Sequence, residues 1–161
     1  MRCRYAIAVA ALAGSAPSLA GAAGTPKGTE LEAKAFLVQA GAPALAFFPT
    51  RAPSHYAFES YSVTGSPPGL DLAFSDTRFS ANPTEMREHE ISFDASFVTK
   101  RSCADEATKR LHVGGTTVYT QAHLVWRCVA IRGGRLVRES ASGPAPAATL
   151  AVLVAYARPG A

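Results

Sequence analysis

The sequence predicts an α+β domain, mainly β, in which a curved antiparallel sheet of about six or seven strands accompanies an N-terminal and a C-terminal helix. Three observations lead to this class. Short runs rich in β-branched and aromatic residues alternate apolar with polar side chains, and two Gly-Gly pairs separate such runs. Apolar residues also recur at helical spacing near both ends of the chain. We therefore expect one domain built around a half-buried sheet.

The beginning of the chain has the composition of an export signal. Arg2 and Arg4 precede an apolar segment, and Ala20-Gly21-Ala22 offers the small side chains that a signal peptidase reads. We expect residues 1–22 to be a cleaved signal peptide and residues 23–161 to form a single exported globular domain, periplasmic or extracellular. No other run approaches the ~18 to 20 apolar residues that a membrane span needs, so we expect no membrane span.

Charge gives little support for a nucleic-acid partner. The chain has 16 Lys and Arg against 12 Asp and Glu, and loss of Arg2 and Arg4 leaves 14 against 12, about +2. The aromatic residues available for a stacking platform fall mostly in core-facing positions of the predicted strands; they are Phe93, Phe97, Tyr119 and Trp126. We expect a monomer with no nucleic-acid partner and no cofactor.

The first predicted element is a helix. Thr29 and Glu32 match a capping box. Leu31, Ala35 and Val38 recur at helical spacing on one face, and the helix should end near Gly41. We expect the two terminal helices to cover one face of the sheet through five apolar residues, namely Leu31, Val38, Leu150, Leu153 and Val154.

Four strand candidates follow this helix. Residues 44–48 form a short apolar run closed by a proline, and residues 56–64 are rich in aromatic and β-favouring side chains. Residues 70–75 and 91–97 alternate apolar with polar side chains, which indicates strands with one wet face. The polar connection over residues 76–89 is the most plausible place for mobility or contact.

Two hairpins are predicted in the second half, at Gly114-Gly115 and at Gly133-Gly134, because glycine accepts the positive φ of such turns at least cost. Between them, residues 122–131 form a central strand. Its two faces carry Leu124, Trp126, Cys128 and Ala130 on one side and Val125, Arg127, Val129 and Ile131 on the other. We interpret Trp126 as a core anchor rather than a ligand contact.

The end of the chain predicts a last helix. Gly143-Pro144-Ala145-Pro146 ends the sheet, and four apolar residues then share one helical face before Pro159, namely Leu150, Leu153, Val154 and Ala157.

Two cysteines, Cys103 and Cys128, follow the predicted leader. In an exported protein an even pair is most simply a disulfide, and closing this loop would stabilise the fold by roughly 3 to 4 kcal/mol. A metal site is the alternative, but neither a Cys-x-x-Cys pair nor a histidine cluster accompanies these cysteines.

The chain also resembles exported bacterial domains of unknown function, found alone or as the extracytoplasmic part of anti-sigma-factor-like proteins. Val113-Gly114-Gly115, Val118-Tyr119, Val125-Trp126-Arg127 and the segment around Leu150 to Ala157 carry the resemblance, with an earlier piece in Phe48-Pro49-Thr50, Pro53 and Tyr56 to Tyr61. The resemblance implies an antiparallel sheet packed by helices and an extracytoplasmic role of the sensing kind.

The residues for catalysis or metal binding are sparse. His112 and His123 lie on adjoining predicted strands, where two partly exposed histidines are the simpler interpretation than a metal pair. No nucleophile motif and no phosphate-binding loop is present. Ser75, Asp76 and Asp94 provide polar groups that alternation places on a wet face.

We therefore expect an exported non-catalytic binding or sensing domain in the bacterial cell envelope, whose partner is a small apolar ligand, a peptide or an envelope protein. No catalytic or metal residue is assigned. The alternative is a small secreted hydrolase with its site in the 76–89 loop and His89 or Glu88 as base. A structural envelope protein is a third possibility, which a large exposed apolar patch would indicate.

Overall fold

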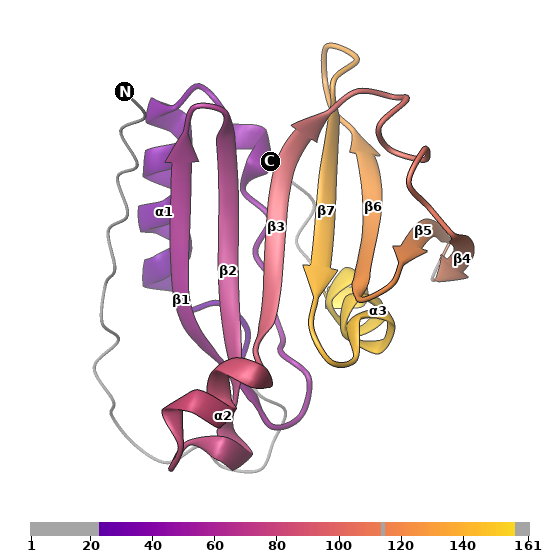
Figure 1. Ribbon diagram of the computed structural model, residues 1–161. Helices are drawn as coiled ribbons and strands as arrows, with labels where there is room; N and C mark the ends of the chain where they lie inside the picture. Colours follow the sequence, from indigo (N-terminus) through magenta and orange to yellow (C-terminus); the bar gives the residue numbers. More distant parts are fainter. Residues whose placement is uncertain (1–22, 114, 157–161) are drawn as a thin grey trace.

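The computed structural model describes residues 23–113 and 115–156 and contains one seven-stranded antiparallel sheet (Figure 1). The strand order is β1-β2-β3-β7-β6-β5-β4. The strands are β1 Tyr56–Gly65, β2 Pro68–Asp76, β3 Ile91–Val98, β4 Lys109–Val113, β5 Thr116–Gln121, β6 Leu124–Ala130 and β7 Leu136–Ser142. The helices are α1 Lys27–Gln39, α2 Pro83–Glu88 and α3 Pro146–Tyr156, with single 3-10 turns η1 Pro43–Leu45 and η2 Thr77–Phe79. The predicted class, a mainly β fold with a helix at each end, is confirmed.

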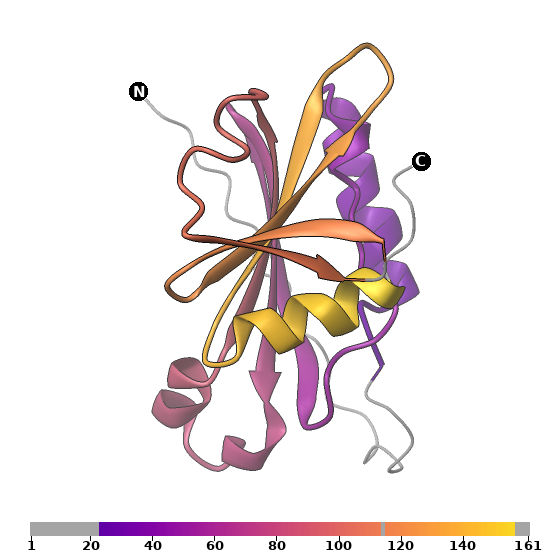
Figure 2. The ribbon, with the colours of Figure 1, turned by 90° about the vertical axis from the view of Figure 1, so that its right-hand side faces the viewer.

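Strands that follow one another in the chain also pair in the sheet, except that β3 and β4 are joined by a connection across the sheet. Residues 99–108 carry the chain from β3, in the middle of the sheet, to β4 at its edge, and β5, β6 and β7 then return strand by strand to β3. Gly133 and Gly134 in the β6–β7 turn have φ of 88° and 76°, as their place in a tight turn requires. Figure 2 shows that the twist carries β4 and β5 steeply across the direction of β1 and β2.

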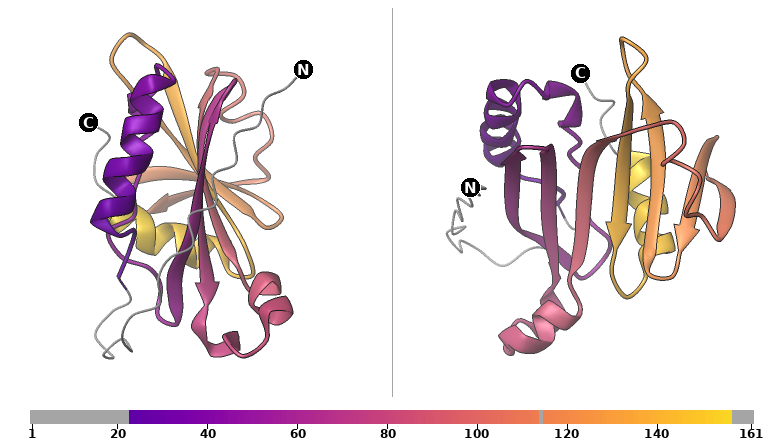
Figure 3. Two further views of the ribbon diagram at one scale, coloured as in Figure 1. Left: turned by 90° about the vertical axis from the view of Figure 1, so that its left-hand side faces the viewer. Right: turned by 45° about the horizontal axis from the view of Figure 1, so that its top comes forward.

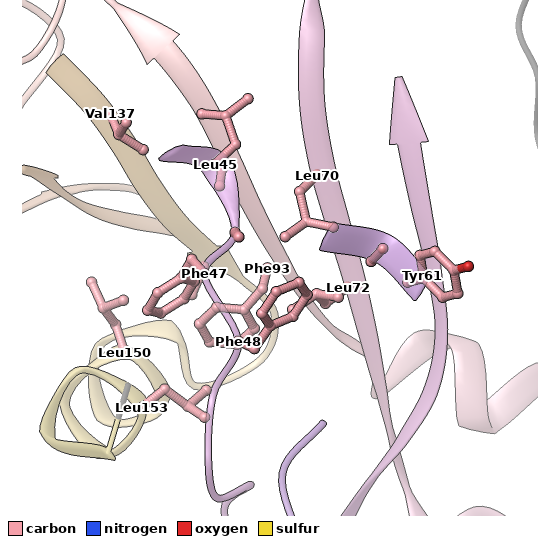
Figure 4. Packing of buried hydrophobic residues seen from close by; sticks show 14 of the residues in the cluster. Leu45, Phe47, Phe48, Tyr61, Leu70, Leu72, Phe93, Val137, Leu150 and Leu153 are labelled. Carbon is pink, nitrogen blue, oxygen red and sulfur yellow. The ribbon is translucent and has the colours of Figure 1, made fainter. Parts of the chain in front are cut away.

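Both long helices lie on the same face of the sheet, and the 99–108 connection lies on the other (Figure 3, left). α1 packs against β1 and β2, α3 packs against β6 and β7, and the segment 42–52 fills the space between them. In Figure 4 the side chains of this segment meet those of the strands and of α3; the labelled residues are Leu45, Phe47, Phe48, Tyr61, Leu70, Leu72, Phe93, Val137, Leu150 and Leu153. The main core therefore lies between the helices and one face of the sheet, and the opposite face is the helix-free face.

The predicted start and buried face of α1 are wrong. The helix begins earlier, after Pro26, and has no side-chain cap, so Thr29 lies within its first turn. Leu31 and Val38 are 71% and 56% exposed, whereas Ala33 and Leu37 are fully buried. The pair at positions 33 and 37 also fits helical spacing, and the small Ala33 side chain lets the helix approach the sheet closely.

The predicted buried face of α3 is confirmed, because Leu150 and Leu153 are buried and Val154 packs against the core. Ala157 and Pro159 lie outside the described residues, as do residues 1–22 of the predicted leader.

Residues 44–48 do not form the predicted strand. They start as η1, in which Leu45 and Ala46 donate their backbone N–H groups to carbonyls three residues earlier. The segment then crosses the apolar face with Phe47 and Phe48 buried, instead of pairing at a sheet edge. Backbone bonds from Gly24 and Thr25 hold its end, and Gly24 lies so close to Pro49 that a Cβ atom there would meet the carbonyl oxygen at 2.0 Å.

Candidate functional site

A line of polar side chains crosses the centre of the helix-free face. Asp71 of β2 lies directly opposite Ser62 of β1 and Asp94 of β3, and Asp94 lies directly opposite Ser140 of β7. Residues directly opposite each other in an antiparallel pair share one face of the sheet. We call these four residues, Ser62, Asp71, Asp94 and Ser140, the polar row.

The centre of the polar row is a pair of aspartates on neighbouring strands. Like charges directly opposite each other destabilise a sheet, and aspartate is depleted in strands. Ser62 Oγ donates a hydrogen bond to Asp71 Oδ2 at 3.0 Å, and Ser140 donates one to Asp94. Both aspartates are half-buried, so each remains within reach of a ligand. The two serines support the carboxyl groups without neutralising them.

The environment of Asp94 favours its protonated form. Burial, together with the hydrogen bond and the charge of Asp71, raises the pKa of Asp94 to about 7, while Ser140 and Arg138 act in the opposite direction. Burial disfavours the charged carboxylate, and a second carboxyl group beside it adds to this effect. The pair therefore holds an extra proton across the mildly acidic range and releases it near neutrality.

This shift predicts a pH dependence of stability. In the unfolded chain an aspartate releases its proton near pH 4, so between about pH 4 and about pH 7 the folded protein binds more protons than the unfolded chain. The free energy of unfolding contributed by Asp94 therefore falls as the pH rises through this window and is constant above it. In Asp94→Asn this titration is absent, and we expect the variant to gain stability relative to wild type as the pH rises.

Urea unfolding at pH values from 4 to 8 checks this prediction, with Asp105→Asn as the control. Asp105 is exposed and ion-paired to Arg101 at 3.0 Å, away from the polar row. Parallel stability profiles for wild type and Asp94→Asn would contradict the proton-holding pair.

The polar row ends at a buried aromatic group. Trp126 lies opposite Ser140 on the same face and is fully buried, which confirms its predicted place as a core anchor. Its Nε1–H donates to the carbonyl oxygen of Cys103 at 2.7 Å, and the Arg138 guanidinium lies 4.4 Å from its ring centroid. The 99–108 connection thus covers this end of the helix-free face.

The predicted disulfide is present and holds that cover in place. Cys103, in the 99–108 connection, is bonded to Cys128 of β6. Arg138, opposite Cys128 on β7, also reaches the connection, since its Nη1 lies 3.8 Å from Glu106 Oε2. Both cysteines are therefore used structurally, next to the polar row but not in it.

The hydrolase candidates of the 76–89 segment are not assembled into a catalytic group. The segment folds into η2 and α2 at one end of the sheet (Figure 1). The His89 imidazole stacks on Phe79 with centroids 4.2 Å apart, and Glu88 is exposed. Within residues 23–113 and 115–156, no hydrogen bond joins the His89 side chain to a serine or a carboxylate.

Ser75 and Asp76 do not lie on a wet face, contrary to the alternation argument. Ser75 is 5% exposed and Asp76 is fully buried. The strand runs directly into η2 at this point, so Asp76 caps η2 by accepting from the backbone N–H of Arg78 at 3.0 Å. The Arg78 guanidinium, 2.6 Å away, holds the pKa of this carboxyl below its usual range.

The two strand histidines lie apart along the β4–β5–β6 hairpins. His112 pairs with Thr117 near the first turn, whereas His123 follows Gln121 in the turn at the other end of β5. Over the part of the chain that the structure describes, no group of three or more His, Cys, Asp or Glu side chains could hold a metal ion.

Sequence reasoning placed Asp94 on a polar face but missed its pairing with Asp71. Each aspartate interrupts an apolar strand pattern, as Leu70-Asp71-Leu72 and Phe93-Asp94-Ala95. This repeated pattern could have predicted the pair. Strands that follow one another in the chain often pair, and two mid-strand aspartates can then lie opposite each other on one face of the sheet.

No helix among the described residues has the length and apolar character needed to cross a membrane. No family model, curated protein or solved structure matches the chain.

Proposed function

We propose that this protein is an exported, non-catalytic binding or sensing domain of the bacterial cell envelope, whose ligand contacts the polar row. One observation carries the proposal: Asp71 and Asp94 lie opposite each other in the middle of the sheet, on the face that no long helix covers. This arrangement costs stability, and such costs are concentrated at functional sites.

The chemistry of the polar row favours a cationic ligand over the small apolar one that a curved sheet suggests. Two adjacent carboxyl groups accept hydrogen bonds from an ammonium or guanidinium group, and charge-assisted bonds of this kind are the stronger ones. Binding a cation would also relieve the repulsion between Asp71 and Asp94 once both are ionised. The ligand class is therefore an amine, or a peptide that presents a basic side chain.

Export is supported by two features of the chain. The signal-like composition of residues 1–22 predicts it, and the bond between Cys103 and Cys128 suits an oxidising compartment. The resemblance to extracytoplasmic domains supports the same location outside the cytoplasm.

A simple diamine tests the proposed site. We expect 1,5-diaminopentane to shift the backbone amide resonances of Asp71, Asp94 and Ser140 in a two-dimensional NMR titration, and glutarate to leave them unchanged. Affinity should increase as the pH rises through about 7, where Asp94 loses its proton. Asp71→Asn and Asp94→Asn should each weaken binding about tenfold, a loss of about 1.4 kcal/mol.

Asp105→Asn is the matched control, since it removes an exposed carboxylate outside the polar row. Equal shifts around all surface carboxylates, or binding that the two row variants leave intact, would overturn the proposal.

A second candidate is hydrolysis at the same carboxyl pair. One observation favours it: a carboxyl group that keeps its proton to about pH 7 beside another carboxyl group matches the needs of acid and base catalysis. Turnover of a chromogenic glycoside or ester that is lost in both row variants and retained in Asp105→Asn would favour this candidate over binding alone.

A further inference from the structure

The β4 strand forms an open edge of the sheet. It is the last strand in the order, its first four residues are exposed, and Leu111 is 40% exposed. Figure 1 and the right panel of Figure 3 both show β4 at the outer margin of the sheet, with no helix or strand of residues 23–113 and 115–156 beyond it. Its backbone pairs with β5 on one side, and no other strand among the described residues pairs with its other side, which therefore presents open N–H and C=O groups.

The other edge of the sheet differs from β4. The register of β1 shifts between Phe58 and Ser60, and a bulge of this kind disfavours the addition of a further strand. The register of β4 runs unbroken from Lys109 to Val113 and includes no proline. Of the two edges, β4 is therefore the one suited to pair with an added strand.

Charge is distributed very unevenly around this edge. Residues 107–138 contain no Asp or Glu and six Lys or Arg, of which Lys109 and Arg110 lie on β4 with His112. The nearest acidic residues precede this stretch and already have partners: Asp105 is paired with Arg101 and Glu106 lies near Arg138. The open edge is thus basic, and nothing on its own strand balances that charge.

A second copy of the chain fits this edge poorly. An antiparallel copy centred on Leu111 would set Arg110 opposite His112 and Lys109 opposite Val113, with basic groups concentrated on both strands. Each copy would bring Lys109 and Arg110 to the shared edge without an acidic partner, and Lys on an edge strand is a usual protection against self-association.

We infer that the β4 edge binds an extended acidic segment of a partner protein, which adds an eighth strand to the sheet. Backbone hydrogen bonds to β4 supply affinity, and side chains supply specificity, as in other cases of strand addition. Alternation along the added strand sets acidic residues opposite Arg110 and His112 and an apolar residue opposite Leu111. The partner segment therefore carries an acidic residue, an apolar residue and a second acidic residue in succession. The β4 edge is distinct from the polar row, so the experiments can contradict one proposal without contradicting the other.

Short peptides test this inference by NMR titration of the full mature chain. A peptide with Glu-Val-Glu at the centre of a threonine-rich strand should shift the amide resonances of β4. Replacing its valine by proline keeps the charge but prevents strand pairing, and it should weaken binding at least about tenfold. A Lys-Val-Lys peptide should not bind.

Variants of the protein provide the matching controls. Arg110→Glu should weaken binding of the acidic peptide at least about tenfold, because it sets a carboxylate opposite an acidic residue of the peptide. Arg132→Glu should change it less than about twofold, because Arg132 is exposed in the β6–β7 turn away from the edge. Equal binding of the valine and proline peptides would overturn the inference. So would equal competition by single-stranded DNA, which would identify the edge as a general polyanion surface.

Discussion

Replacing Trp126 with alanine is expected to lower the free energy of unfolding by about 3 to 5 kcal/mol. The side chain is fully buried, stacks on Tyr119 with ring centroids 5.9 Å apart, and lies beneath the Arg138 guanidinium. Its loss would leave a cavity and an unpaired Cys103 carbonyl beneath the 99–108 connection. Urea unfolding followed by circular dichroism measures the change.

Two further variants distinguish the loss of buried volume from the loss of the hydrogen bond and from a surface substitution. Trp126→Phe keeps most of the ring volume but removes the hydrogen bond to Cys103, so it should cost less, about 1 to 3 kcal/mol. Val152→Ala removes an exposed apolar group from α3 and should stay within about 0.5 kcal/mol of wild type. A Trp126→Ala variant as stable as Val152→Ala would show that Trp126 is not a core anchor.

Removing the disulfide is the second large change. Cys103 and Cys128 are separated by 25 residues, and a closed loop of this length constrains the unfolded chain by about 3 to 4 kcal/mol. The double variant Cys103→Ser with Cys128→Ser should lose about this much stability. Wild type in the presence of reductant should behave like the variant.

Intact mass of the exported protein provides the independent measurement. The mature chain should begin near Ala23 and gain two hydrogens on reduction. Two free thiols before reduction would contradict the disulfide, and a mature chain that retains residues 1–22 would contradict the predicted leader.

Most of the sheet could be predicted because its signals are local. Alternation of apolar and polar side chains located β2, β3 and β6, and glycines marked the β4–β5 turn at Gly115 and the β6–β7 turn at Gly133-Gly134. The β5–β6 turn, where Ala122 has φ of 49°, carried no such signal. The same alternation put Trp126 and Cys128 on one face of β6, which the structure confirms. These patterns depend only on the two-residue period of a strand and on the φ values that a turn requires.

The wrong predictions concern segments in which two arrangements fit the local sequence equally well. In α1 both the Leu31 and Val38 pair and the Ala33 and Leu37 pair fit a helical face, and only contact with β1 and β2 decided which was buried. Likewise, residues 44–48 are apolar enough for a strand. The structure uses them to cover the sheet, because Phe47 and Phe48 fill the space between α1 and α3.

By itself, the sequence determined the class of fold, the hairpins, the core position of Trp126 and the pairing of the two remaining cysteines. Tertiary structure alone decided the polar row and the open basic edge, because both depend on which strands become neighbours. Asp71 and Asp94 meet through the pairing of β2 with β3, and Ser140 joins them only because β7 returns to pair with β3. That return also leaves β4 at the margin, so one long-range pairing completes the polar row and exposes the β4 edge. Residue spacing along the chain carries no record of such a pairing, which results from burial of the whole apolar face at once.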